Sequence, residues 1–90
     1  MAWYRVAYLP AVLEDLQSID QGISQRLFDK TKWIASNIDN LRHEPLAFDL
    51  PGMSQYAVAD WRILYAIDRE DDVVDIHRIS SRKELYRRKA

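Results

Sequence analysis

The residues best suited to chemistry lie in the last eighteen positions, 73–90, which read VVDIHRISSRKELYRRKA. A histidine and a tyrosine stand there among six lysines and arginines: His77, Arg78, Arg82, Lys83, Tyr86, Arg87, Arg88 and Lys89. Guanidinium groups form paired hydrogen bonds with phosphate oxygens, and an aromatic ring can stack on a nucleobase. This combination favours a polyanion, RNA or DNA, as the partner of this end of the chain.

The distribution of charge points the same way. The 90-residue chain has a net charge of −1, but residues 1–72 carry seven basic against twelve acidic residues, and residues 73–90 carry six against two. Such asymmetry indicates a polyanionic partner at the basic end. A solvated C-terminal helix explains the same charge equally well, so charge alone does not choose between these interpretations.

The first half of the chain predicts a strand followed by two helices. Residues 3–9 are rich in aromatic and β-branched residues and stop at Pro10, which predicts a strand. Apolar residues at helical spacing predict a short helix over residues 10–20. Asp20 then caps a longer helix that ends within residues 37–45. Its inward stripe is expected to be Ile23, Leu27, Ile34 and Ile38, and its outward residues Gln25, Arg26, Asp29 and Lys32.

After Pro45 the pattern changes to the period of strands. Residues 46–50 predict a brief strand, residues 56–60, 61–68 and 73–79 predict an antiparallel meander, and Ser80 or Ser81 caps a last helix. The expected fold is α+β in the order β-α-α-β-β-β-α, as one domain over residues 1–90. A helical hairpin covers one face of an antiparallel-dominated sheet, and a short basic helix ends the chain.

Alternation along the strands assigns their faces. Ile63, Tyr65 and Ile67 are expected to pack with Val74 and Ile76 against the helices, since this pairing collects the apolar residues. Arg62 then lies on the opposite, open face. The hairpin register adds Asp75 opposite Ala66 and His77 opposite Leu64 to that face.

Composition excludes several classes of protein. The chain has no cysteine, so it can form neither a disulfide nor a thiolate zinc site. The acidic residues 68–72 lack the spacing and the glycine of a calcium loop and fit a solvated hairpin turn. No apolar run approaches the length of a membrane span, and the N-terminus lacks the form of a signal peptide. We expect a cytoplasmic protein with no membrane association, no metal and no cofactor.

Four segments appear in a specific order: L-x-G at residues 50–52, Y-x-V at 56–58, W-R-I-L-Y at 61–65 and R-I-x-x-R-K-E-L-Y at 78–86. Together with the order of elements, they resemble the RelE/ParE superfamily of type II toxins over almost the whole chain. The resemblance implies the RelE-like fold and a cognate antitoxin as partner. It implies one of two activities, since RelE-like members cleave mRNA in the ribosomal A site and ParE-like members inhibit DNA gyrase.

The resemblance also implies roles for particular residues. Arg62, Arg82 and Tyr86 match the two catalytic arginines and the C-terminal tyrosine of RelE-like enzymes. Two departures stand beside these matches. Ala57 and Ala59 occupy the positions of the lysines of RelE, and residues 80–82 read Ser-Ser-Arg where relatives often have Gly-His-Arg.

Cleavage of this kind needs a base for the 2′-hydroxyl, cations for the phosphorane and an acid for the departing 5′-oxygen. Arg62 and Arg82 are expected to supply the cations without a metal. His77 is the expected base, because its ordinary pKa suits both proton steps, and His43 and Tyr86 are the alternatives. The remaining expected RNA-binding residues are Arg78, Lys83, Arg87 and Arg88.

Each of these assignments has a structural alternative. Arg62 could form a surface ion pair with Asp60 or Asp75, His77 could be a half-buried strand histidine, and Tyr86 could pack the last helix onto the sheet.

At the level of function, the leading hypothesis is a ribosome-dependent mRNA endoribonuclease held inactive by an acidic antitoxin. The alternatives are a gyrase inhibitor without nuclease activity, which Ala57 and Ala59 favour, and a module that has lost catalysis and only binds its antitoxin or RNA.

Overall fold

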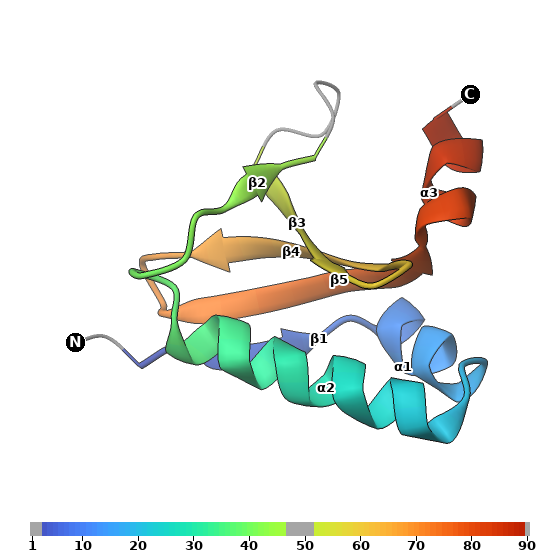
Figure 1. The fold of residues 1–90 in the computed structure, drawn as a ribbon. Coiled ribbons are helices and arrows are strands. Elements are labelled where there is room, and N and C mark those ends of the chain that lie inside the picture. The colour runs from blue at the N-terminus through green and yellow to red at the C-terminus, as the bar shows by residue number, and fades with distance from the viewer. Residues whose placement is uncertain (1–2, 47–51, 90) are drawn as a thin grey trace.

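The computed structural model describes residues 3–46 and 52–89, with the side chains of 86–89 outside the description. Five strands form one mixed sheet in the order β1-β5-β4-β3-β2, in which β1 runs parallel to β5 and the other pairs are antiparallel. Figure 1 shows α1 and α2 on one face of this sheet and α3 rising from its end on the other side. The elements are β1 Arg5–Tyr8, α1 Pro10–Gln17, α2 Gln21–Ser36, β2 Glu44–Pro45, β3 Met53–Val58, β4 Trp61–Asp68, β5 Val73–Ser81 and α3 Arg82–Lys89.

This arrangement is the predicted RelE-like α+β fold, and its helix boundaries follow local signals. Pro10 occupies the start of α1, where its missing N–H costs nothing. Asp20 caps α2, because its side chain accepts a hydrogen bond of 3.2 Å from the Gly22 N–H. Ser81 caps α3 by accepting a hydrogen bond of 3.1 Å from the Glu84 N–H. Of the two serines predicted as the cap, Ser81 is therefore the one used.

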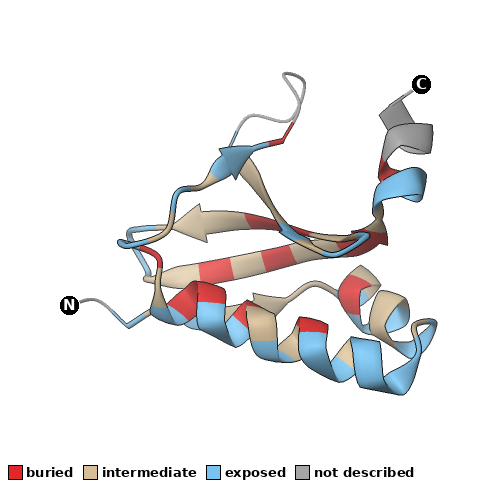
Figure 2. Ribbon diagram, viewed as in Figure 1, coloured by how far each residue is buried: buried red, intermediate tan, exposed pale blue. Residues whose placement is uncertain are grey.

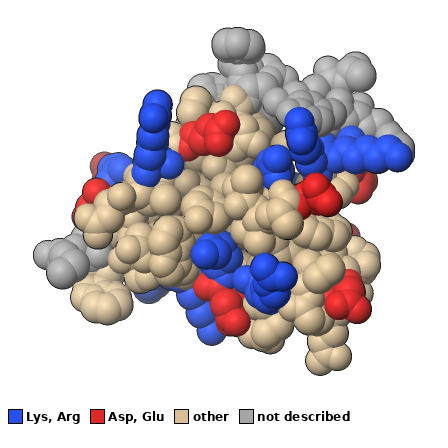
Figure 3. Space-filling model, in the orientation of Figure 1, with Lys and Arg blue, Asp and Glu red and all other residues tan. Residues whose placement is uncertain are grey.

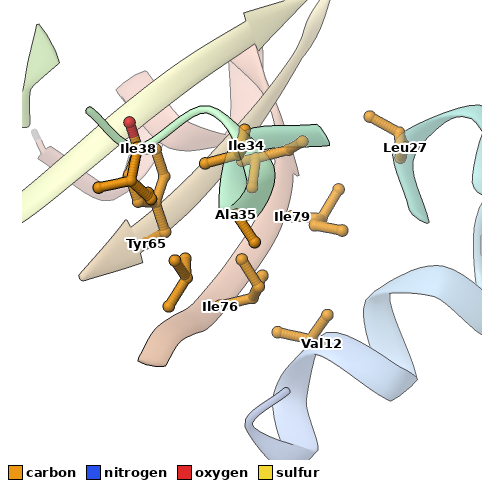
Figure 4. Packing of buried hydrophobic residues seen from close by; sticks show 10 residues of the cluster. Val12, Leu27, Ile34, Ala35, Ile38, Tyr65, Ile76 and Ile79 are labelled. Atoms are coloured by element: carbon orange, nitrogen blue, oxygen red, sulfur yellow. The ribbon is translucent and has the colours of Figure 1, made fainter. Parts of the chain in front are cut away.

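The main core lies between the helical hairpin and the inner face of the sheet. Val12 of α1 and Leu27 and Ile34 of α2 pack against Ile76 and Ile79 of β5 (Figure 4). Figure 2 shows buried residues gathered where these helices face the central strands. The predicted inner residues Ile63, Tyr65, Val74 and Ile76 are fully buried, and Ile67 packs against them.

Ile23 departs from its predicted place in the stripe. It is 36% exposed, whereas Leu27, Ile34 and Ile38 are buried. The first turn of α2 extends over the β3–β4 turn, where Ile23 lies beside Val58. Helical periodicity correctly places Ile23 on the side of α2 that faces the sheet. It does not reveal that the first turn of α2 lies beyond the end of the strands, over the β3–β4 turn.

A β-bulge overturns one predicted pair of the β4–β5 register. Asp75 pairs with Ala66 as predicted, but Leu64 pairs with Arg78, because the register shifts between Leu64 and Tyr65 and leaves His77 as the extra residue of β5. The apolar pattern explains the bulge. Strict alternation cannot place residues 76 and 79 on one face, and the extra residue brings Ile79 opposite Ile63 in the core.

The outer face of the sheet is less open than predicted. Leu64 is only 7% exposed there and packs with Leu46, Leu85 and Met53 in a second cluster. Leu85 therefore anchors α3 to this face. The predicted strand over residues 46–50 lies outside the described residues apart from Leu46, and the short strand β2 precedes it.

Among the described residues, no helix is long and apolar enough to cross a membrane. In the same part of the chain, no group of three or more histidine, aspartate or glutamate side chains is placed to hold a metal ion. The acidic turn between β4 and β5 is ordered by Asp68, whose Oδ1 accepts hydrogen bonds from the N–H groups of Glu70 at 3.0 Å and Asp71 at 3.1 Å.

Candidate functional site at the β3–β4 turn

The β3–β4 hairpin closes through the pair of Val58 and Trp61, which leaves Ala59 and Asp60 as a two-residue turn. Ala59 has a φ of 52°, a left-handed conformation that favours glycine. Both carbonyl groups of the turn are held from neighbouring elements. The Arg62 guanidinium donates to the Ala59 carbonyl at 3.0 Å, and the Arg82 N–H donates to the Asp60 carbonyl at 2.7 Å.

Arg62 projects from the face opposite the core, because it pairs with Ala57 and Ser80 and alternates with the buried Ile63. Its Nη1 also donates to the carbonyl of Trp61 at 2.9 Å. The predicted alternative of an ion pair with Asp60 or Asp75 is wrong among the described residues, since the guanidinium contacts carbonyl oxygens instead. Within that part of the chain, Nε and Nη2 make no hydrogen bond and can donate to an anion.

Arg82 opens α3 directly beside the turn and is exposed. It lines an open hollow of 480 Å³ together with Asp60, Ser81 and Lys83. Arg62 is not among the residues that line this hollow. The structure thus brings both arginines to one turn, Arg62 through its side chain and Arg82 through its backbone.

Arg78 is committed to an ion pair with α1. Its Nε and Nη2 each donate to a different carboxylate oxygen of Asp15 at 2.9 Å, and the Ile79 N–H donates to the same carboxylate at 2.9 Å. The hydrogen bonds to Asp15 raise the pKa of the Arg78 guanidinium above its ordinary value. Asp15, which the sequence did not single out, therefore fixes the end of α1 to the unpaired edge of β5.

His77 lies at the bulge and is half-buried. Its imidazole makes no hydrogen bond to the described residues. Tyr86, Arg87 and Arg88 lie on α3, but their side chains are outside the described part of the structure. Lys83 is exposed in the hollow beside Arg82.

His43, an alternative base, is engaged elsewhere. Its Nε2 lies 2.8 Å from the Ile38 carbonyl, which can only accept, so Nε2 carries the proton. Its Nδ1 therefore accepts the hydrogen bond of 2.6 Å from the Tyr65 hydroxyl. Burial raises the pKa of Tyr65 to about 12. His43 ties the segment after α2 to the core and is not placed at the turn.

Residues 6–86 match the family model described as the ParE toxin of the type II toxin-antitoxin system parDE. The chain belongs to the RelE/ParE superfamily of type II toxins. A search of curated protein sequences found no match. The matched range includes Arg62, Arg82 and both strands of the turn, so the candidate site lies within the part of the chain that matches the family.

Solved structures of RelE/ParE toxins share the fold. The toxin-antitoxin complex RelBE2 from Mycobacterium tuberculosis contains a chain with 23% identity and a TM-score of 0.81, covering 90% of this chain and 93% of that one. A mutant of E. coli toxin RelE in the free state has 16% identity and a TM-score of 0.73, with coverages of 96% and 92%. The chromosomal ParDE system from P. aeruginosa has 12% identity and a TM-score of 0.74, with coverages of 88% and 96%. At these identities the likeness establishes the fold, and both branches of the superfamily share it.

Proposed function

We propose that this toxin stops translation by cleaving mRNA on the ribosome and that a cognate antitoxin holds it inactive. The observation that supports the nuclease branch is the meeting of Arg62 and Arg82 at one two-residue turn. The Arg62 guanidinium lies at that turn and Arg82 is exposed beside it, so the two residues together can stabilise the charge that develops on a phosphodiester during cleavage. This role of the two arginines concerns a phosphodiester and involves no contact with gyrase.

The proposed reaction is an internal transphosphorylation. The 2′-hydroxyl loses its proton to a base and attacks phosphorus, the bond to the 5′-oxygen breaks, and an acid returns a proton to that oxygen. Nε and Nη2 of Arg62 and the Arg82 guanidinium donate to the phosphorane oxygens. We assign the proton steps to His77 and Tyr86, and Lys83, Arg87 and Arg88 to binding the RNA backbone. Arg78, which the sequence also predicted to bind RNA, is removed from this set by its ion pair with Asp15.

The antitoxin assignment rests on relatives. The similar structures from M. tuberculosis and P. aeruginosa are a toxin-antitoxin complex and a toxin-antitoxin system. Figure 3 shows basic side chains gathered at the side of the molecule from which α3 rises. An acidic antitoxin segment lying over this side would cover the hollow of Arg82 and Lys83 and exclude mRNA.

The test is cleavage of mRNA by the purified chain on translating ribosomes, measured by primer extension. We expect Arg62→Ala and Arg82→Ala each to lose most of the cleavage rate, about 10²-fold or more. Arg69→Ala is the matched control, because Arg69 forms an exposed ion pair with Asp39 and follows the end of β4 that is opposite the candidate site. Intact mRNA with the unmodified chain would contradict the proposal.

Arg62→Lys separates catalysis from bracing of the turn. A lysine keeps a charge but loses the fork of guanidinium donors that reaches both a carbonyl oxygen and a phosphate. We expect Arg62→Lys to keep the free energy of unfolding within about 1 kcal/mol and still to cleave much more slowly than the unmodified chain.

Gyrase inhibition is the second candidate, and two observations favour it. The matching family model is that of the ParE toxin. In addition, Ala57 is exposed opposite Arg62, at a position where a RelE-like enzyme would carry a lysine. Inhibition of supercoiling by purified gyrase, with translation unharmed, would establish this branch. Tight antitoxin binding without growth arrest would instead indicate a module that has lost its activity.

A further inference from the structure

Three surface hollows lie around the β3–β4 turn, and each shares lining residues with the next. The hollow at the start of α3 shares Asp60 with a second hollow, which shares Arg26 and Val58 with a third. The second hollow is lined by Ile23, Arg26, Val58, Ala59, Asp60 and Trp61, and the third by Arg26, Asp29, Lys30, Trp33 and Val58. We call the second and third hollows together the α2 groove. It leads from the turn that holds both arginines to the middle of α2.

Positive charge prevails along this path. Arg82 and Lys83 stand at its beginning and Arg26 and Lys30 along α2, against the two carboxylates of Asp29 and Asp60. The Asp29 carboxylate already accepts a hydrogen bond of 3.0 Å from Gln25. The Arg26 side chain is exposed and makes no hydrogen bond or ion pair within the described part of the structure. Within the α2 groove itself, Arg26 and Lys30 are matched by Asp29 and Asp60, so the positive excess of the path comes from Arg82 and Lys83 at its beginning.

Aromatic rings fix the far end of the groove. The Lys30 ammonium lies 4.5 Å from the ring centroid of Trp33 and 5.7 Å from that of Tyr56. The two rings are 5.7 Å apart and tilted by 55°. Trp33 is nevertheless 40% exposed, which is unusual for so large an apolar side chain. A cation held in place beside an exposed indole suits a ligand that alternates phosphates with flat bases.

We infer that the α2 groove binds single-stranded RNA as a continuation of the strand held at the turn. Arg26 and Lys30 are one helical turn apart and would take neighbouring phosphates, while a base stacks on Trp33. The inference rests on the proposed RNA function and extends it to a surface away from the reacting phosphate. An acidic peptide would use the cations, but only one with aromatic residues at the right spacing would also match the indole, whereas every nucleotide of RNA carries a flat base.

The test measures binding of a fluorescein-labelled, 2′-O-methylated oligoribonucleotide by anisotropy, without ribosomes. We expect Arg26→Ala/Lys30→Ala to weaken affinity about tenfold and to reduce the slope of log affinity against log salt by about 1.4, for two phosphate contacts to a single strand. The matched control is Lys32→Ala/Arg42→Ala, which removes the same charge outside the groove and is expected to change affinity about twofold or less. Lys32 is exposed on the same helix, with its ammonium 4.4 Å from the Phe28 ring centroid, and Arg42 is exposed in the following loop.

Tryptophan substitutions test the stacking. Binding is expected to quench fluorescence in the unmodified chain. Trp33→Phe is expected to reduce that quenching to the part due to Trp61, which lines the same groove, while affinity falls about threefold or less. Trp33→Ala is expected to weaken affinity about tenfold. Circular dichroism of each variant checks that the fold is retained, and Trp3→Phe is the matched control that should keep the quenching.

Several outcomes would overturn the inference: no binding of the oligoribonucleotide at about 50 mM salt, equal affinity of the groove and control variants, or quenching that is undiminished in Trp33→Phe. Loss of binding to a labelled polyglutamate peptide, with RNA affinity intact, would assign the groove to an acidic protein partner and also overturn it. The oligoribonucleotide cannot be cleaved, so binding is read independently of activity. If the groove variants lose RNA affinity but the unmodified chain leaves mRNA intact on ribosomes, only the proposed nuclease is refuted. If the unmodified chain cleaves mRNA but the groove variants bind RNA as tightly as it does, only this inference is refuted.

Discussion

Ala59 has a left-handed backbone conformation that its β-carbon disfavours. Its φ of 52° places a β-carbon in the left-handed region at the first position of the turn. The Arg62 guanidinium and the Arg82 N–H hold the two carbonyl groups of that turn from either side. Backbone strain of this kind persists where surrounding contacts hold the backbone in place. Here those contacts come from the two candidate catalytic arginines.

Ala59→Gly is therefore expected to stabilise the toxin by about 0.5–1 kcal/mol, because glycine adopts a positive φ without steric cost. The measurement is the free energy of unfolding in urea. Ala57→Gly is the matched control, since Ala57 is equally exposed but lies within β3, where glycine should destabilise by about 0.5–1 kcal/mol. Destabilisation by both substitutions would contradict the strained turn.

Tyr65→Phe should remove a hydrogen bond from the core. The change leaves Nδ1 of His43 without its donor and is expected to lower the free energy of unfolding by about 1–3 kcal/mol. Tyr4→Phe is the control, because the Tyr4 hydroxyl makes only an exposed contact of 3.4 Å with Arg69. Equal stability of the two variants would show that the Tyr65–His43 bond contributes nothing.

Tyr65 also predicts a loss of stability at high pH. Its pKa is raised from 10.0 to about 12 in the folded state, so the neutral hydroxyl is favoured by folding. This contribution is fully present below pH 10 and is lost as the pH rises toward 12. Urea unfolding across that window should show a steeper decline for the unmodified chain than for Tyr65→Phe. Parallel declines would contradict this assignment.

At the scale of elements, one carboxylate joins α1 to β5. Asp15 is 12% exposed in its side chain and accepts three hydrogen bonds, two from Arg78 and one from the Ile79 N–H. β1 pairs with β5 only as far as Ile76, so this carboxylate satisfies a backbone group that no strand reaches. The pair holds the bulged end of β5 in the position from which α3 begins.

Asp15→Ala is expected to lower the free energy of unfolding by about 2–3 kcal/mol, because it leaves a partly buried guanidinium and a backbone N–H without their acceptor. Asp39→Ala is the matched control. Its ion pair with Arg69 spans 3.5 Å with both side chains more than half exposed, and its loss should cost about 0.5 kcal/mol or less. Urea unfolding distinguishes the two, and equal effects would show that the Asp15 pair is no stronger than a surface pair.

At the scale of the whole molecule, the sheet separates a large core from a small one. The inner face carries the main core under α1 and α2, whereas the outer face has only the cluster of Leu46, Leu64 and Leu85 to hold α3. The proposed site lies where α3 meets the turn. The stability of the fold and the placement of the site thus depend on different sets of contacts.

Leu85→Ala should therefore release α3 more than it unfolds the protein. We expect faster amide hydrogen exchange in residues 82–89 and a global destabilisation of about 1 kcal/mol, against about 3 kcal/mol or more for Ile34→Ala in the main core. The measurements are hydrogen exchange and urea unfolding. Equal global destabilisation by the two substitutions would show that α3 and the core unfold together.

The amino-acid sequence alone determined the order of the three helices and the four longer strands, the cap at Asp20, the inner face of β4 and the superfamily, because these depend on local periodicity, capping groups and short motifs. Tertiary structure decided which cations are already engaged. Arg78 pairs with Asp15, 63 positions away, and Arg62 and Arg82 meet at one turn. It also placed His77 in a bulge, because burying both Ile76 and Ile79 required one extra residue in β5. Such outcomes depend on which distant groups compete for the same hydrogen bonds and the same core, and no local pattern contains that information.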